Sequence, residues 1–105
     1  MKMKTSTFEF DLVSLGTKMA TRPNGQAFLD DVMSALSAYE TVVIDFRGQA
    51  PTPSFADQCI GGLAALLGLE PFKQRVKLKN VAESARPLIR HVILSRAARG
   101  ETAAA

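Results

Sequence analysis

The segment TVVIDFRGQAPTPSFADQCIGGLAALLG, residues 41–68, predicts a strand, a loop and a helix in that order. Residues 41–46 form a β-branched apolar run with apolar side chains on both faces, which is typical of a central strand covered on both sides. The loop that follows contains Pro51 and Pro53, each of which forces an extended backbone on the residue before it. We therefore expect a buried strand whose chain turns back through a stiff loop into a helix.

The predicted helix begins at Ser54, because Ser54 with Asp57 three residues later resembles a capping box. Gly68 is suited to end it. On a helical wheel the apolar side chains fill one arc, which must face the core. The opposite arc is small and carries a single charge: Asp57, Gln58, Gly61, Gly62 and Ala65.

This nearly uncharged outer face has three open explanations. A neighbouring helix or the tail of the same chain covers it, since a middle helix is often flanked on both sides. It is a docking surface for a second copy of the chain or for a different protein. It is simply exposed to solvent. Glycines within a helix reduce its stability, but they allow another backbone to come close.

The remaining chain alternates between strand-like and helix-like patterns. Residues 7–12 and 75–79 alternate apolar and polar side chains, which predicts half-buried strands. Residues 23–38 and 84–99 repeat apolar side chains every three or four positions, which predicts amphipathic helices. The alternating order of strands and helices argues for one α/β domain.

We expect a single small domain over residues 1–100, with a flexible tail at residues 101–105. Its sheet is expected to be mixed and to have three or four strands, with about three helices packed mainly on one face. The outer face of the first strand is acidic and that of the last is basic, so the two charges complement each other if they share a sheet surface.

Composition limits the environment and the partners. No apolar stretch is long enough to span a bilayer and the N-terminal residues do not form a signal peptide, so we expect a cytoplasmic protein that does not enter a membrane. The single cysteine excludes an internal disulfide. Residues 72–99 hold eight basic side chains and one acidic one, a net charge of +7, and the other residues carry −4. Such polarity suits an acidic or nucleic-acid partner, although it is also compatible with a solvated face.

The sequence predicts neither catalysis nor metal or cofactor binding. Cys59 falls on the core-facing arc of its helix, where it acts as a small apolar residue. His91 lies off the apolar stripe of the last helix, and no Cys and His residues have metal-ligand spacing. Asp45 and Asp57 bracket the proline-rich loop, but we expect one to end a strand and the other to cap a helix.

The apolar strand ending in Asp45-Phe46, the glycine at Gly48 and the Ser-Phe-Ala-Asp run at 54–57 resemble the STAS-like domain family of bacterial proteins. Arg22 and Gly25 match a further Arg-x-x-Gly feature, so the resemblance spans residues 20–96. That family is related to the STAS domains of anti-sigma factor antagonists. The resemblance implies one sheet with helices packed on it and a non-enzymatic regulatory role.

The related antagonists dock on a kinase-like ATPase through the strand-to-helix loop, where phosphorylation of a serine switches binding. In this sequence Pro53 occupies the usual phospho-acceptor position, and Gln58 replaces a usual glutamate. Ser54 and Thr52 are the hydroxyls that can substitute as phospho-acceptors, because a phosphate is favoured at a helix N-terminus.

We therefore predict a regulatory protein-interaction module that binds another protein, such as a histidine-kinase-like ATPase or a transcription regulator, or a second copy of itself. The predicted contact surface joins the loop to the outer helix face: Pro51, Thr52, Pro53, Ser54, Asp57, Gln58, Gly61, Gly62 and Ala65. One alternative is a nucleic-acid-associated protein that uses a basic strip: Arg75, Lys77, Lys79, Arg86 and Arg90. Another is a phage or mobile-element inhibitor of a host complex.

Overall fold

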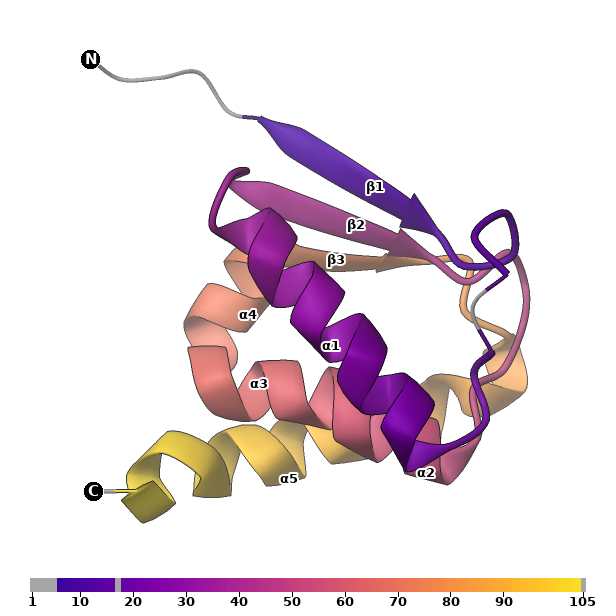
Figure 1. Ribbon diagram of the computed structural model, residues 1–105. Helices are drawn as coiled ribbons and strands as arrows, with labels where there is room; N and C mark the ends of the chain where they lie inside the picture. The colour runs from indigo at the N-terminus through magenta and orange to yellow at the C-terminus, as the bar shows by residue number, and fades with distance from the viewer. Residues whose placement is uncertain (1–5, 17, 105) are drawn as a thin grey trace.

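The computed structural model describes residues 6–16 and 18–104 (Figure 1). In these residues one sheet is formed by three strands in the order β1-β2-β3: β1 (Thr7–Asp11), β2 (Thr41–Asp45) and β3 (Val76–Lys79). Both pairings are parallel, and Ile44 in the central strand lies between Phe10 and Leu78. The predicted central position of the 41–46 strand is confirmed.

The expectation of a mixed sheet is wrong, because both strand pairs are parallel. A parallel neighbour requires a crossover that returns the chain to the same end of the sheet, and here each crossover is helical. All helices lie on one side of the sheet (Figure 1). The helical segments are α1 (Arg22–Leu36), α2 (Pro53–Ala56), η1 (Asp57–Gly61), α3 (Gly62–Leu67), α4 (Leu69–Arg75), η2 (Glu83–Ala85) and α5 (Arg86–Ala104).

The predicted second helix is present as a composite of α2, the π-helical η1 and α3, which we call the central helix, residues 53–67. Gly68 ends it with a φ of 87°, a backbone conformation that glycine adopts without strain. Helix α4 follows directly and was not predicted, since its seven residues are too few to show a periodic apolar stripe. Helix α5 extends to Ala104, which covers four positions of the predicted tail; the flexibility of that tail stays a prediction, and residue 105 lies outside the described residues.

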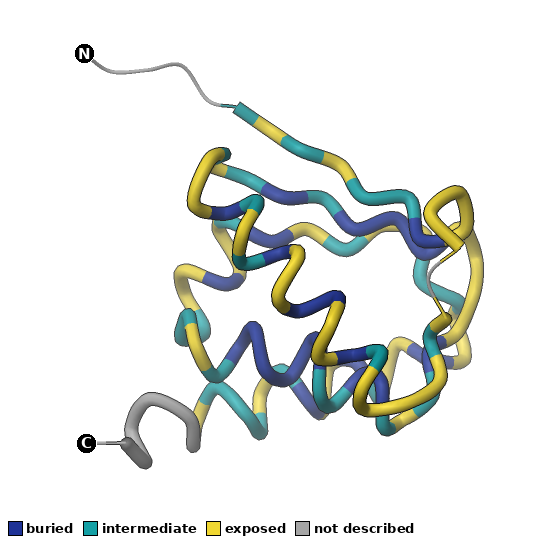
Figure 2. Tube along the Cα trace, viewed as in Figure 1, coloured by how far each residue is buried: buried dark blue, intermediate teal, exposed yellow. Residues whose placement is uncertain are grey.

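Among residues 6–16 and 18–104, helices cover one face of the sheet only, so the expectation of cover on both sides is wrong. On the helix side, Val42, Ile44 and Phe46 are fully buried beneath the helices. On the other side, Thr41 and Val43 remain half-buried, and the flanking strands are partly exposed (Figure 2). The charged side chains of β1 and β3 share this open face, as their complementary charges suggested.

The outer face of the central helix is covered from within the chain. A Cβ added at Gly62 would lie 3.0 Å from Leu29 Cδ2 on α1, and one added at Gly61 would lie 2.8 Å from Arg96 Cγ on α5. Both glycines are buried. Of the three explanations for this face, cover by neighbouring helices is therefore the one that the structure supports, with α1 on one side and α5 on the other.

A third glycine makes the contact between α1 and the central helix close. A Cβ at Gly25, near the start of α1, would lie 3.0 Å from the Gln58 Cβ and 3.1 Å from the Phe55 carbonyl oxygen. Backbone oxygen cannot swing aside as a side-chain tip can. Aromatic packing extends this contact, since the rings of Phe28 and Phe55 stack with centroids 6.4 Å apart.

We expect Gly25→Ala to lower the free energy of unfolding by about 1–3 kcal/mol, as overpacking does. Gly62→Ala should change it by less than about 1 kcal/mol, because Leu29 meets the new methyl only with a flexible side-chain tip. Urea denaturation of both variants beside the wild type checks this. Equal effects, or stabilisation by Gly25→Ala from its better helix propensity, would contradict the close approach.

Candidate functional site

The start of the central helix is held by Thr52 rather than by Ser54. The Thr52 hydroxyl oxygen accepts a hydrogen bond from the Phe55 amide at 3.2 Å, and the same hydroxyl donates to the Ala20 carbonyl at 2.8 Å. The predicted Ser54 cap is wrong by two positions, because Pro53 already occupies the first helical turn, where its missing N–H is harmless. Thr52 therefore ties the proline-rich loop to the segment before α1.

Asp57 joins three helical segments. Its carboxylate accepts a hydrogen bond from Arg22 Nη1 at 2.8 Å, at the start of α1, and lies 3.1 Å from Arg96 Nη1 on α5. Beside it, Gln58 Nε2 donates to Gln26 Oε1 at 2.6 Å. The hydrogen bond from Arg22, together with Arg96, holds the pKa of Asp57 below its ordinary value of 3.8. This cluster binds α1, η1 and α5 to one another.

The predicted loop-and-helix contact surface is therefore mostly occupied by internal contacts. Pro51, Gly61 and Gly62 are buried, so the expectation that these three contribute to an exposed surface is wrong. Of the nine residues, one is exposed and five are half-buried: Pro53 is exposed, and Thr52, Ser54, Asp57, Gln58 and Ala65 are half-buried. The two candidate phospho-acceptors differ in how far their hydroxyls are engaged. The Thr52 hydroxyl already makes two hydrogen bonds, which phosphorylation would break.

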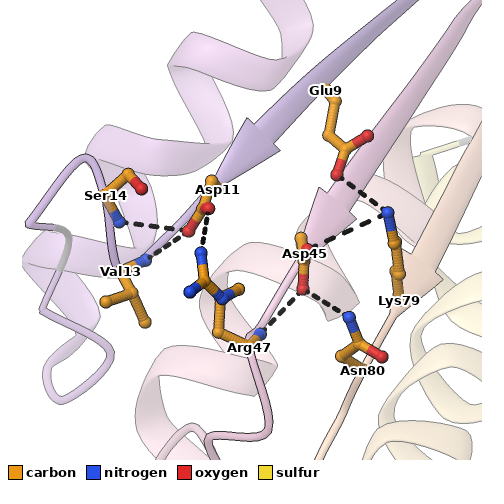
Figure 3. A network of polar contacts seen from close by, with 8 residues as sticks. All are labelled: Glu9, Asp11, Val13, Ser14, Asp45, Arg47, Lys79 and Asn80. Carbon is orange, nitrogen blue, oxygen red and sulfur yellow. Dashed lines mark hydrogen bonds and ion pairs between the residues drawn. The ribbon is translucent and has the colours of Figure 1, made fainter.

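A second polar cluster lies where the strands end, on the open face of the sheet (Figure 3). Asp45 is buried at the end of β2 and accepts hydrogen bonds from the Asn80 side chain at 3.0 Å and the Arg47 backbone amide at 2.8 Å. The Asn80 bond, then the Arg47 bond, lowers the pKa of Asp45. Arg47 also pairs with Asp11 at the end of β1. The predicted strand-ending role of Asp45 is confirmed. The predicted capping role of Asp57 is wrong, because Thr52 caps the central helix and the Asp57 carboxylate pairs with Arg22 and Arg96.

This strand-end cluster includes unusual backbone geometry. Arg47 and Asn80 have positive φ angles of 51° and 54°, which non-glycine residues adopt rarely. The hydrogen bonds to Asp45 hold both in place. Each of its three carboxylates lies near a cation: Lys79 Nζ lies 3.2 Å from Glu9 Oε2 and 4.0 Å from Asp45 Oδ2, and Arg47 pairs with Asp11. The cluster thus pairs its charges internally and holds the loops after β2 and β3 together.

Three members of the predicted basic strip are used inside the fold. Arg75 donates from Nη2 to the carbonyls of Leu36 at 2.7 Å and Tyr39 at 3.0 Å, so it satisfies carbonyls at the C-terminal end of α1. Lys77 Nζ donates to the Lys73 carbonyl at 2.6 Å, and Lys79 pairs with Glu9 across the sheet face. These three cations therefore face acceptors of the same chain.

The five basic residues do not form one continuous surface. Lys77 and Lys79 lie on the open sheet face beside acidic side chains, whereas Arg86 and Arg90 project from α5 on the helical side. The sequence missed this division because it depends on which face of the sheet each element occupies. Arg86 and Arg90 instead border the groove described next.

A groove of about 490 Å³ lies between α4, β3 and α5. Seven of its lining side chains are apolar: Leu69, Phe72, Leu78, Val81, Ile89, Ile93 and Leu94. The other four are polar and include no acid: Lys73, Asn80, Arg86 and Arg90. Leu94 at its edge is 51% exposed, although the groove floor includes the buried Phe72 and Ile89. Sequence patterns did not reveal this groove, since its residues come from three separate elements.

Among the described residues, Cys59 and His91 are not placed beside groups that would activate them for catalysis or metal binding. Cys59 is buried in the core, which raises the pKa of its thiol to about 12, as expected for an inert apolar cysteine. His91 is exposed on α5. Within residues 6–16 and 18–98, no three His, Cys, Asp or Glu side chains gather as metal ligands. No helix of the described residues has the length and apolar character to cross a membrane.

Comparison with known proteins gives one match. A family model described as STAS-like domain of unknown function (DUF4325) matches residues 24–86, which is more than half of the chain. The matched span runs from the first turn of α1 to the first residue of α5 and includes the central helix and its glycines. Searches of curated proteins and of solved structures give no significant match.

We expect Asp57→Asn to lower the free energy of unfolding at pH 7 by about 1 kcal/mol, the sum of two partly exposed ion pairs. Because folding lowers the pKa of Asp57, its contribution is present above pH 3.8 and is lost as the pH falls through the lower folded pKa. The difference between wild type and variant should therefore shrink on acidification below about pH 4. Urea titrations across this range measure it.

Asp31→Asn is the matched control, since Asp31 is exposed on α1 and forms no ion pair within residues 6–16 and 18–98. That variant should unfold like the wild type at every pH. If Asp57→Asn is equally neutral, the Arg22–Asp57–Arg96 cluster does not hold the helices together.

Proposed function

Because the chain belongs to the family of STAS-like domains of unknown function, we propose that it is a non-enzymatic interaction module that regulates another protein by binding it. The observation that carries the proposal is the apolar groove between α4, β3 and α5. We place the contact surface there rather than at the glycine face of the central helix, because α1 and α5 occupy that face. The expected compartment remains the cytoplasm.

The groove has the properties of a protein contact site. Its floor is apolar, and the exposed Leu94 continues this apolar surface to the edge of the groove. Contiguous exposed apolar surface with a polar rim is typical of interaction sites. The basic side chains at the edge favour a partner surface of negative charge. A partner that inserts apolar side chains into the groove would bury its apolar floor and the exposed Leu94.

The two alternatives are less well supported. Nucleic-acid binding needs cations along one surface, and the predicted basic strip is divided between the open sheet face and α5. A kinase-like ATPase or a transcription regulator remains the class of partner that the resemblance to STAS domains implies. If the chain comes from a phage or mobile element, a host complex would be bound through the same groove.

Phosphorylation of Ser54 remains a proposal. Thr52 is the weaker acceptor because its hydroxyl caps the helix.

We expect Leu94→Glu to weaken partner binding by at least about tenfold, since a charge would enter the apolar groove. The partner is first captured from the organism that encodes the chain, by photo-crosslinking from position 94, and is then purified. Its Kd is measured against the wild type and the variant by calorimetry. Circular dichroism shows that the variant remains folded, which its exposure predicts.

Leu66→Glu is the matched control. Leu66 is 55% exposed, as Leu94 is 51% exposed, but it lies on α3 outside the groove. It should bind the partner as the wild type does. If Leu66→Glu abolishes binding and Leu94→Glu preserves it, the contact surface is not the groove and the proposal is wrong.

A further inference from the structure

We infer that the groove accepts an acidic amphipathic helix, whose apolar stripe enters the groove and whose carboxylates face Arg86 and Arg90. This inference rests on the proposed function and names the chemistry of its partner. It follows from the placement of charge around the groove, from the spacing of the residues on α5, and from the character of the neighbouring strand edge.

Charge around the groove is of one sign. Arg86 and Arg90 on α5 and Lys73 on α4 stand on its two helical sides. Lys73 has only a distant partner, Glu70, at 3.9 Å, with both side chains more than half exposed. Within residues 6–16 and 18–98, Arg86 and Arg90 form no ion pair and donate no side-chain hydrogen bond. An anionic partner therefore meets two cations, Arg86 and Arg90, that no carboxylate within residues 6–16 and 18–98 pairs with.

The residues of α5 form two parallel rows along the groove. Ile89 and Ile93, four positions apart, supply apolar side chains, and Arg86 and Arg90, also four positions apart, supply charge. Side chains with this spacing stand about 6 Å apart on a helix. A partner helix with apolar residues at positions i and i+4, bordered by acids at the same spacing, matches both rows.

The neighbouring strand edge disfavours an extended partner. β3 is an edge strand, and a peptide could add to its free edge in principle. It has only four residues, however, and carries Lys77 and Lys79. Lys77 Nζ also bonds the Lys73 carbonyl at 2.6 Å beside this edge. Short edge strands with lysines resist strand addition, whereas the helical sides of the groove suit helix packing.

The test uses three amphipathic helical peptides with identical leucine stripes, flanked by glutamate, glutamine or lysine. Fluorescence anisotropy measures their binding to the full chain. We expect the glutamate peptide to bind about tenfold more tightly than the glutamine peptide, a difference of about 1.4 kcal/mol. In the double variant Arg86→Glu, Arg90→Glu this preference should reverse in favour of the lysine peptide.

The single variant Arg90→Glu should weaken the preference, and Lys18→Glu is its control, because it lowers the net charge by the same two units at an exposed position outside the groove. This control should keep the preference of the wild type. If all three peptides bind alike, or if the control loses the preference equally, the acidic-partner inference is wrong while the groove stays a docking site. If no peptide binds at about 1 mM, both proposals are wrong.

A membrane surface is the other anionic and apolar partner to exclude. Vesicles containing an anionic lipid are therefore titrated in parallel. Binding of vesicles without binding of the glutamate peptide, lost in the Arg86→Glu, Arg90→Glu variant, would overturn the inference in favour of a lipid surface.

Discussion

The rest of the structure depends on the close packing of two helices against the glycines of the central helix. α1 approaches Gly62 through Leu29, and α5 approaches Gly61 through Arg96. A side chain at Gly61 would displace the Arg96 side chain, and one at Gly62 would shift the tip of Leu29. Because both neighbours are close, one carboxylate, Asp57, reaches Arg22 on α1 and Arg96 on α5 at once. The three helices thereby become one layer on one face of the sheet.

The groove lies where the helices cover the sheet less completely. α5 packs against η1, α3 and α4. The helix-facing side of β3 is covered less than that of β2: Ile44 is fully buried, whereas Leu78 remains half-buried. The space between β3, α4 and α5 is lined with apolar side chains that no described residue fills.

Sequence patterns predicted the positions of the strands and helices better than the direction of the strands and the packing between helices. The strands at 7–12, 41–46 and 75–79 and the long helices follow from local periodicity, and the structure confirms them to within a few residues. Periodicity carries no information on strand direction, so the parallel sheet was missed. The unusual composition of the central helix was recognised, but the partners of Gly61 and Gly62 depend on tertiary packing. The groove was out of reach for the same reason, although Arg86 and Arg90 were marked as a basic feature.

Solvent paramagnetic relaxation of methyl groups distinguishes a closed glycine face from an open groove. A soluble gadolinium complex is added to methyl-labelled protein, and relaxation is measured at each methyl group by NMR. We expect strong enhancement for Leu94 and Ile93 in the groove, and protection for Leu29 and Leu63 beside the glycines. Enhancement of Leu29 equal to that of Leu94 would show that α1 does not cover the central helix and that the glycine face is open.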